Sequence, residues 1–228
     1  MNKNLFLFDW QIQGYFRRKR KEYNNNNISH MCDKISEKIF TGEEDDDQVF
    51  FFNVKRYENG KVLLQNGSST NHAHIMMSSK KLMQNCKKEG MFHLDGTYKL
   101  IKNGFPVLIF GISDIQGSFH PIAICITSNE EEKDFKEFYQ GIITLAEALE
   151  IDFHPRFIMQ DACNASYNAA KNVNLESEIL MCYFHVLYNI KKYYKNKMST
   201  NDYKLLNFIL LQISCLTVRL NIPKSLIA

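Results

Sequence analysis

The sequence has little that points to secretion or to a membrane. Its apolar start, LFLFDWQIQ, is too short for a signal peptide and runs into the basic residues RRKRK. The six cysteines are scattered and form no compact framework, so we expect reduced thiols in a nuclear or cytoplasmic protein. The most apolar late segment, 205–220, is shorter than the ~20 residues of a membrane span and contains Asn207, Gln212 and Arg219. It predicts a buried helix.

The chain also lacks a strong net charge. Its 28 basic residues nearly balance its 25 acidic ones, for a formal net charge of +3. Overall charge therefore neither requires nor excludes a nucleic-acid partner, and any basic surface must be local. The 228 residues, 45% of them apolar, are enough for one globular domain with attached material.

The first 77 residues predict an irregular, β-rich and partly disordered region. A basic run followed by asparagines (17–27) and the acidic run GEEDDD (42–47) indicate solvated segments, and the basic run is a candidate nuclear-import signal or phosphate contact. QVFFFNVKRY and GKVLLQN then predict β-structure, with a hairpin turn at 58–60. Residues 78–90 predict a short helix that stops at Gly90.

From residue 91 onward the pattern becomes regular. Three strands separated by turn signals predict an antiparallel meander, and helices then alternate with further strands. The expected elements are strands over 91–101, 105–113 and 119–128, a helix over 131–149, a strand over 156–161, a helix over 164–173 with Asn164 as its N-cap, a strand over 178–184 and a basic helix over 185–197. This order predicts an α/β fold, in which a mixed sheet of three antiparallel and then parallel strands is flanked by helices, as in the RNase H-like fold.

Two aspartates fall where this architecture brings strands together. Asp95 interrupts the apolar strand FHLDGTYKL, and Asp161 ends the strand RFIMQD. If these strands pair in parallel, the carboxylates approach each other, and a divalent cation would offset their repulsion and desolvation. Oxygen ligands favour Mg²⁺ or Mn²⁺ over zinc, and two such ions promote phosphoryl transfer. The alternative is that Asp95 caps a turn at Gly96 and Asp161 only ends a strand.

A second candidate site is the C-x-x-H pattern formed by Cys182 and His185. Structural zinc takes four ligands, and no second pair completes a site here, so zinc is not favoured. The alternative is a buried cysteine at a strand end and a histidine at a helix start. Two other close pairs lack further support as zinc ligands: His30 with Cys32, and His72 with His74. The helix after the pattern offers candidate phosphate contacts, or only a solvated face, in Lys191, Lys192, Lys195 and Lys197.

Four segments occur together in the order found in one transposase family: HLDGTYKL, SDIQGSFHPIAICITSNEEEKDFKEF, FIMQDACNASYNAAKNV and CYFHVLYNIKKYYK. Over residues 78–197 the chain resembles the MULE (Mutator-like element) transposase domain. The resemblance implies an RNase H-like, DDE-type nuclease that cuts and joins DNA at transposon ends with two metal ions. Asp95 and Asp161 match its first two catalytic acids. Cys182 and His185 match its C-x-x-H signature, for which we expect a structural or DNA-contacting role.

The sequence departs from that family in its third acid. This acid, usually a Glu, follows the C-x-x-H beyond a helical insertion; residues 198–228 predict the start of such an insertion, and no Asp or Glu follows Asp202. The segment QDACNAS also lacks the acid often found two residues after the second Asp, and no complete zinc-finger module lies upstream. We therefore expect a C-terminally truncated domain with weak or no catalytic activity, because misplacement of metals by an ångström is costly.

Three functions stay open from the sequence. The first is a transposase acting on DNA, and the second is a non-catalytic DNA- or protein-binding module that keeps the fold. The third is another metal-dependent nuclease, which requires a further carboxylate near the pair, with Glu130 and Asp114 as its candidates. We expect a DNA partner, a nuclear location, and no membrane or small-molecule substrate, and we leave a homo-oligomer open.

Overall fold

The computed structural model describes residues 28–101, 104–161, 163–173, 176–194, 197, 199, 201–206 and 208–209. Contacts divide the chain into two compact units, Met1–Leu180 and Met181–Ala228. The first contains the sheet with the helices that pack on it, and the second contains the basic helix. They are taken in turn below.

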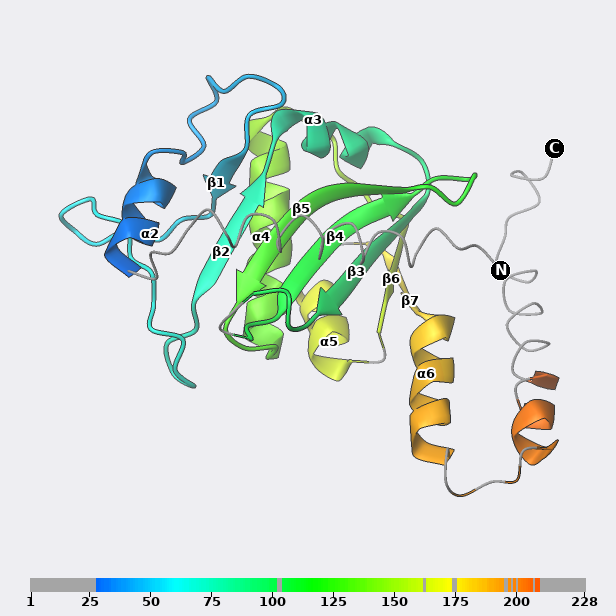
Figure 1. The fold of residues 1–228 in the computed structure, drawn as a ribbon. Helices are drawn as coiled ribbons and strands as arrows, with labels where there is room; N and C mark the ends of the chain where they lie inside the picture. Colours follow the sequence, from blue (N-terminus) through cyan, green and yellow to red (C-terminus); the bar gives the residue numbers. More distant parts are fainter. Residues whose placement is uncertain are drawn as a thin grey trace. The chain divides into compact units, whose positions relative to one another are not determined.

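A seven-stranded mixed sheet in the order β1-β2-β5-β4-β3-β6-β7 organises the first unit (Figure 1). β4 pairs antiparallel with β3 and β5, whereas β3 pairs parallel with β6. This confirms a mixed α/β sheet built from a meander and a crossover strand. The strands are β1 (Phe50–Phe52), β2 (His74–Ser78), β3 (Met91–Thr97), β4 (Val107–Ser113), β5 (Phe119–Thr127), β6 (Phe157–Gln160) and β7 (Glu178–Met181).

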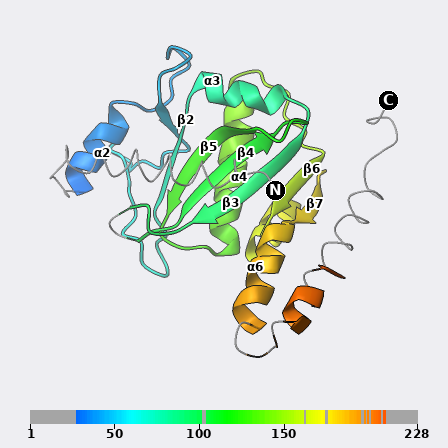
Figure 2. The same ribbon diagram turned by 45° about the vertical axis from the view of Figure 1, so that its right-hand side comes forward.

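Two helices, α4 (Glu132–Ala148) and α5 (Asn164–Asn172), pack on one face of this sheet (Figure 2). A capping box opens α4, in which Glu131 and Asp134 each accept a hydrogen bond from the other's backbone N–H. The apolar stripe of α4 is buried in the main core, as its spacing predicted. Its members are Phe135, Phe138, Ile142 and Leu145.

The opposite face of the sheet carries a smaller core. Val107 and Ile109 alternate along β4 with residues of the main core, and Leu100, from the loop after β3, completes the cluster. Half-buried side chains of β5 pack against it. The sheet therefore has one face covered by helices and one face covered partly by a loop.

Two expectations about the N-terminal half need correction, and a third is confirmed. The residues before β1 include a helix, α2 (Ile28–Ser36), that no pattern indicated, and β2 was likewise missed. The predicted helix over 78–90 is two short pieces, α3 (Lys80–Met83), capped by the Ser79 side chain, and a 3-10 turn, η1 (Gln84–Lys87). The hairpin turn at 58–60 is present, since Tyr57 and Lys61 are hydrogen-bonded across it.

Two boundaries near the C-terminal strands also differ from expectation. The N-cap of α5 is Cys163 rather than Asn164, and its side chain makes no capping hydrogen bond. β7 ends at Met181, and helix α6 (Tyr183–Tyr194) begins two residues before its predicted start. The aromatic pair after Cys182 thus belongs to the helix and not to the strand. The basic run 17–21 and most of the apolar segment 205–220 lie outside the described residues.

No helix within the described ranges is long and apolar enough to cross a membrane.

Candidate metal centre

Asp95 and Asp161 lie at the same level of two neighbouring parallel strands. The β3–β6 ladder pairs Phe92 with Ile158, and its last pair is Leu94 with Gln160. Asp95 is the next residue of β3 and Asp161 directly follows β6, so each stands one position beyond this last pair, and the backbones of neighbouring strands are ~4.8 Å apart. Because side chains alternate along strands, Asp95 projects from the face opposite to Leu94, and the same alternation continued past Gln160 assigns Asp161 to that face.

The two carboxylates differ in how far they are exposed and in what holds them. Asp95 is exposed and belongs to a central strand, paired with Ile109 of β4 on its other side. Asp161 is half-buried and directly follows the last residue of β6. Each therefore stands on or beside a strand of the main sheet and not on a long loop.

A buried polar contact fixes the end of β6 just before Asp161. Gln160 is 3% exposed, and its Oε1 accepts hydrogen bonds from Ser166 Oγ at 2.6 Å and from the Tyr139 hydroxyl at 3.3 Å. The Asp161 carbonyl accepts a hydrogen bond from the Cys163 N–H at 2.7 Å. Helices α4 and α5 thereby position the backbone that presents Asp161.

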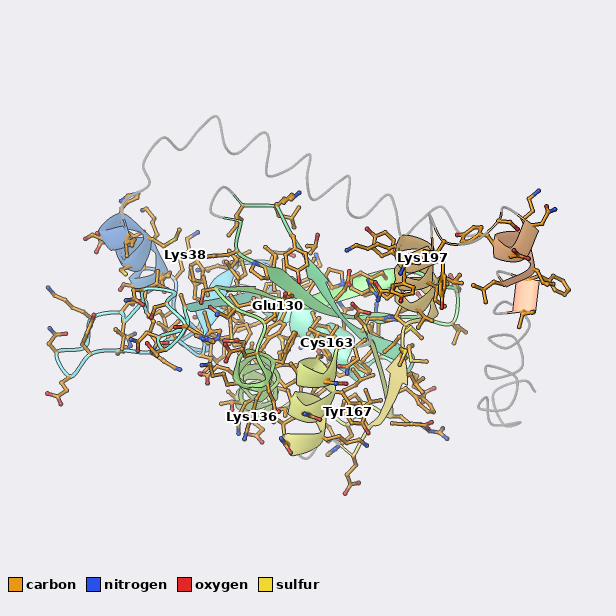
Figure 3. All side chains as sticks on the ribbon, turned by 90° about the horizontal axis from the view of Figure 1, so that it is seen from below. Lys38, Glu130, Lys136, Cys163, Tyr167 and Lys197 are labelled. Atoms are coloured by element: carbon orange, nitrogen blue, oxygen red, sulfur yellow. The ribbon has the colours of Figure 1, made fainter. Side chains whose placement is uncertain are left out.

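Glu130 reaches the same end of β3 from the segment between β5 and α4 (Figure 3). Its Oε1 lies 2.9 Å from where a Cβ on Gly96 would stand, and its Oε2 accepts a hydrogen bond from the Tyr98 hydroxyl. That hydrogen bond raises the pKa of Tyr98 to about 12, and burial and the nearby negative charge of Asp161 contribute to the same shift. Glu130 thus sits over Gly96 on the helix-covered face, whereas Asp95 projects from the other face.

Asp114, the other acid considered as a third ligand, lies at the wrong end of the sheet. It follows β4, and its neighbour Ser113 pairs with Met91 at the start of β3. Four residues of strand separate that position from Asp95, or roughly 13 Å. The Asp114 carboxylate accepts hydrogen bonds from its own turn and lies 2.9 Å from His120 Nε2. It takes no part in the candidate centre.

The donor set at this edge is two carboxylates, which are hard oxygen ligands of the kind that Mg²⁺ and Mn²⁺ prefer. In the part of the chain that the structure describes, no three His, Cys, Asp or Glu side chains gather so that they could hold a metal ion. The predicted pair is therefore adjacent by register, and neither Glu130 nor Asp114 joins it as a third ligand.

The C-x-x-H pair lies in the second unit, at the start of α6. Cys182 directly precedes the helix, and its carbonyl accepts the first-turn hydrogen bond from the Val186 N–H at 3.2 Å. Cys182 and His185 are both half-buried. The two residues are one helical turn apart, and their place relative to the aspartates is not defined, because they belong to different units.

The four candidate lysines follow on or just after α6. Lys192 is exposed, and Lys197 places its Nζ 3.8 Å from the centroid of the Tyr193 ring. Lys191 lies within α6, but its side chain falls outside what the structure describes, as does the whole of Lys195.

A buried cluster that the sequence did not predict lies at the start of α4. Asp134 is fully buried, and its Oδ1 is 2.7 Å from both His72 Nδ1 and His74 Nε2. His72 Nε2 faces the Ser69 carbonyl at 2.9 Å. Each nitrogen of His72 therefore faces an oxygen acceptor.

This cluster ties β2 to α4. Burial alone would raise the pKa of Asp134, but hydrogen bonds from His74, from the Glu131 backbone and from His72 outweigh it and hold that pKa below its ordinary value. The close spacing of His72 and His74 was the only signal in the sequence, and it does not name Asp134 as their partner.

Comparison with known families bears on the same segment. Residues 91–189 match the family model of the MULE transposase domain. The resemblance predicted from the four motifs is confirmed over this segment, which contains both aspartates and the C-x-x-H pair. A domain of this family indicates a transposase function and implies interaction with DNA in general. None of the curated proteins matches the chain.

Proposed function

We propose that residues 91–189 form an RNase H-like domain for DNA cleavage and strand transfer, with Asp95 and Asp161 as its metal-binding carboxylates. The observation that carries this proposal is their position on the rung that follows the last β3–β6 pair. The strand order supports the fold, because the meander β3-β4-β5 is followed by β6 beside β3 and then by β7. Ligands are commonly bound at the carboxyl ends of such strands.

Asp95 and Asp161 fit a hard divalent cation, Mg²⁺ or Mn²⁺. They supply two negatively charged oxygen groups on one face, and β3 and β6 limit how far these groups can separate. When bound, such ions activate a water or a 3′-hydroxyl and stabilise the leaving oxygen of a phosphodiester. The protein's part is to orient the two carboxylates.

We expect this chain to cut DNA weakly or not at all. Two carboxylates leave most of the coordination sphere of an ion to water, so its position is poorly fixed, and small errors in position are costly in rate. Glu130 does not supply the missing oxygen ligand, because it lies over Gly96 on the helix-covered face, where it accepts a hydrogen bond from the Tyr98 hydroxyl. A third acid from outside the sheet would be needed for full activity.

The DNA contacts in this proposal come from the basic helix. Lys191, Lys192, Lys195 and Lys197 contact backbone phosphates, which makes binding fall with salt by a log–log slope of roughly −0.9 per neutralised phosphate. Cys182 and His185 shape the start of that helix. A protein with this role would act in the nucleus.

A non-catalytic DNA- or protein-binding module is the second candidate. It is favoured by the absence of a third carboxylate at the centre among the residues that the structure covers. It predicts DNA or protein binding that is insensitive to divalent metal.

Metal titration separates the two candidates. The melting temperature of the purified chain should rise with millimolar Mg²⁺ or Mn²⁺, because binding to the folded state stabilises it. The rise should vanish in the Asp95→Asn/Asp161→Asn double variant. It should persist in Asp152→Asn, which removes a carboxylate from the loop between α4 and β6, whose side chain is 89% exposed.

A rise that is equal in all three proteins would reflect general cation binding and would overturn the assigned centre. No rise in the parent chain would favour the binding module.

A further inference from the structure

The second unit differs from the first in the sign of its charge. Residues 181–228 contain seven Lys or Arg residues and a single acid, Asp202. Asp202 is exposed, and its carboxylate accepts a hydrogen bond from the Ser199 hydroxyl. Ser199 lies two positions after Lys197, the last of the candidate lysines. A surface of this composition attracts polyanions and repels cationic partners.

This unit also exposes tyrosines on the basic helix. Tyr188 is 54% exposed, Tyr193 is 62% exposed and Tyr194 is 36% exposed. At about 100° per residue, the exposed residues Tyr188, Lys192, Asn189 and Tyr193 fall within roughly 140° of the circumference of α6. Aromatic rings and an ammonium group therefore alternate around one side of the helix.

The Tyr193 ring is held in place. Lys197 Nζ lies 3.8 Å from its centroid, a cation–π contact, and the Tyr194 ring meets it at 83° with centroids 4.8 Å apart. These contacts limit the rotation of the ring while most of the residue stays exposed. A second Tyr–Lys pair, Tyr188 and Lys192, has the same spacing of four residues.

We propose that α6 binds single-stranded DNA, with unpaired bases stacking on Tyr188 and Tyr193 and phosphates contacting Lys192 and Lys197. Stacking on an exposed ring requires a base whose face is open, and bases in a duplex are closed to it. The excess of positive charge favours a nucleic acid over a protein as the occupant. This inference rests on the proposed function, since it specifies that the DNA bound by α6 is single-stranded.

The test measures binding to the full chain by fluorescence anisotropy with three labelled probes. They are an oligo-dT strand, an abasic strand of the same length and a duplex, and the oligo-dT measurement is repeated in high salt. The chain should bind oligo-dT about tenfold more tightly than the abasic strand, because one well-stacked base contributes on that order. The duplex should bind no more tightly than the abasic strand.

Tyr188→Ser and Tyr193→Ser should each reduce oligo-dT affinity severalfold and leave abasic-strand affinity unchanged. Tyr167→Ser is the matched control, because Tyr167 is 46% exposed on α5 of the first unit (Figure 3). It should change neither affinity. The Lys192→Gln variant should weaken all strands alike and reduce the salt dependence.

Each alternative result has a distinct meaning. Equal affinity for oligo-dT and the abasic strand, or equal losses in Tyr167→Ser, would overturn base stacking while leaving DNA binding intact. No binding to any strand would overturn the proposed function as well. A change in sedimentation of the tyrosine variants, with oligo-dT affinity unaffected, would assign the same face to a protein partner or a second copy of the chain.

Discussion

The two units of this protein differ in the side chains that their candidate sites present. In the first, two carboxylates stand at the carboxyl ends of the parallel strands β3 and β6, in a sheet whose main core lies on one face. In the second, a short basic helix exposes tyrosines and lysines. Carboxylates need fixed positions to hold a cation, whereas a strand-binding surface needs accessible charge and open rings.

The two units also differ in the burial and hydrogen bonding of an acidic side chain. Asp134 in the first unit is fully buried and lies within hydrogen-bond distance of two histidines, while Asp202 in the second is exposed and hydrogen-bonded to Ser199. Substituting each acid therefore measures how differently the two units are built.

The largest effect should come from Asp134→Ala. It leaves His72 and His74 without the buried carboxylate that both face, and breaking a buried pair of this kind costs about 3–5 kcal/mol of unfolding free energy. Asp202→Ala should change stability by less than about 0.5 kcal/mol. Urea unfolding followed by circular dichroism measures both. Similar losses in the two variants would break the contrast between the units.

A pH effect of up to about 3 kcal/mol should come from His93. Burial lowers its pKa from the ordinary 6.5 to about 4, and its Nε2 has no hydrogen-bond partner among the described residues. The unfolded chain therefore takes up a proton before the folded one, so stability present above pH 6.5 is lost as the pH falls from about 6.5 to about 4.

Unfolding free energies in metal-free buffer across that pH range provide the check. The His93→Gln variant should have a shallower loss, whereas His154→Gln, whose side chain is 86% exposed, should follow the parent chain. Parallel curves for the parent and His93→Gln would show that the interior around β3 does not penalise a charge.

Gly111→Ala should destabilise the first unit by about 2 kcal/mol, the usual cost of overpacking. A Cβ there would stand 2.4 Å from Phe119 Cζ and 2.7 Å from the His120 carbonyl oxygen, where the β4–β5 register shifts. Gly96→Ala should cost less, because its nearest contact is the end of the Glu130 side chain, which can swing away. Thermal unfolding compares the two, and an equal cost would contradict the packing described at the bulge.

The smallest effect should come from single lysines. Lys192→Gln should reduce the salt slope of DNA binding by about 0.9, the value of one phosphate contact. Lys136→Gln, an equal charge change on the exposed side of α4, should leave the slope unchanged. Equal reductions would mean that net charge, and not the basic helix, governs binding.

The sequence predicted the meander and α4 closely, because apolar periodicity, turn signals and acidic residues at the helix start agree with one another there. β2 was missed, because HIMMS has no clear alternation, and its strand character depends on pairing with β5, from His74 with Thr127 onward. The N-cap of α5 was displaced by one residue, from Asn164 to Cys163, since a good capping side chain does not fix which residue turns first.

For the candidate centre, the sequence named both carboxylates, and their adjacency depended only on the parallel pairing of β3 with β6. The sequence did not indicate on which face of β3 Glu130 would lie. That position depends on the glycine at 96 and on the Tyr98 hydroxyl. Likewise, Asp134 is 62 residues from His72, and only the packing of α4 against β2 brings them together.

Cleavage by bound Fe²⁺ tests the central claim most directly. Fe²⁺ replaces Mg²⁺ at oxygen sites and, with ascorbate and peroxide, generates radicals that cut the backbone near the ion. A cation shared by the two aspartates predicts two cuts, at the ends of β3 and β6 beside Asp95 and Asp161. Excess Mg²⁺ should suppress these cuts, and Asp95→Asn and Asp161→Asn should each abolish them. Cuts elsewhere, or cuts that survive both substitutions, would contradict a shared cation site at this pair.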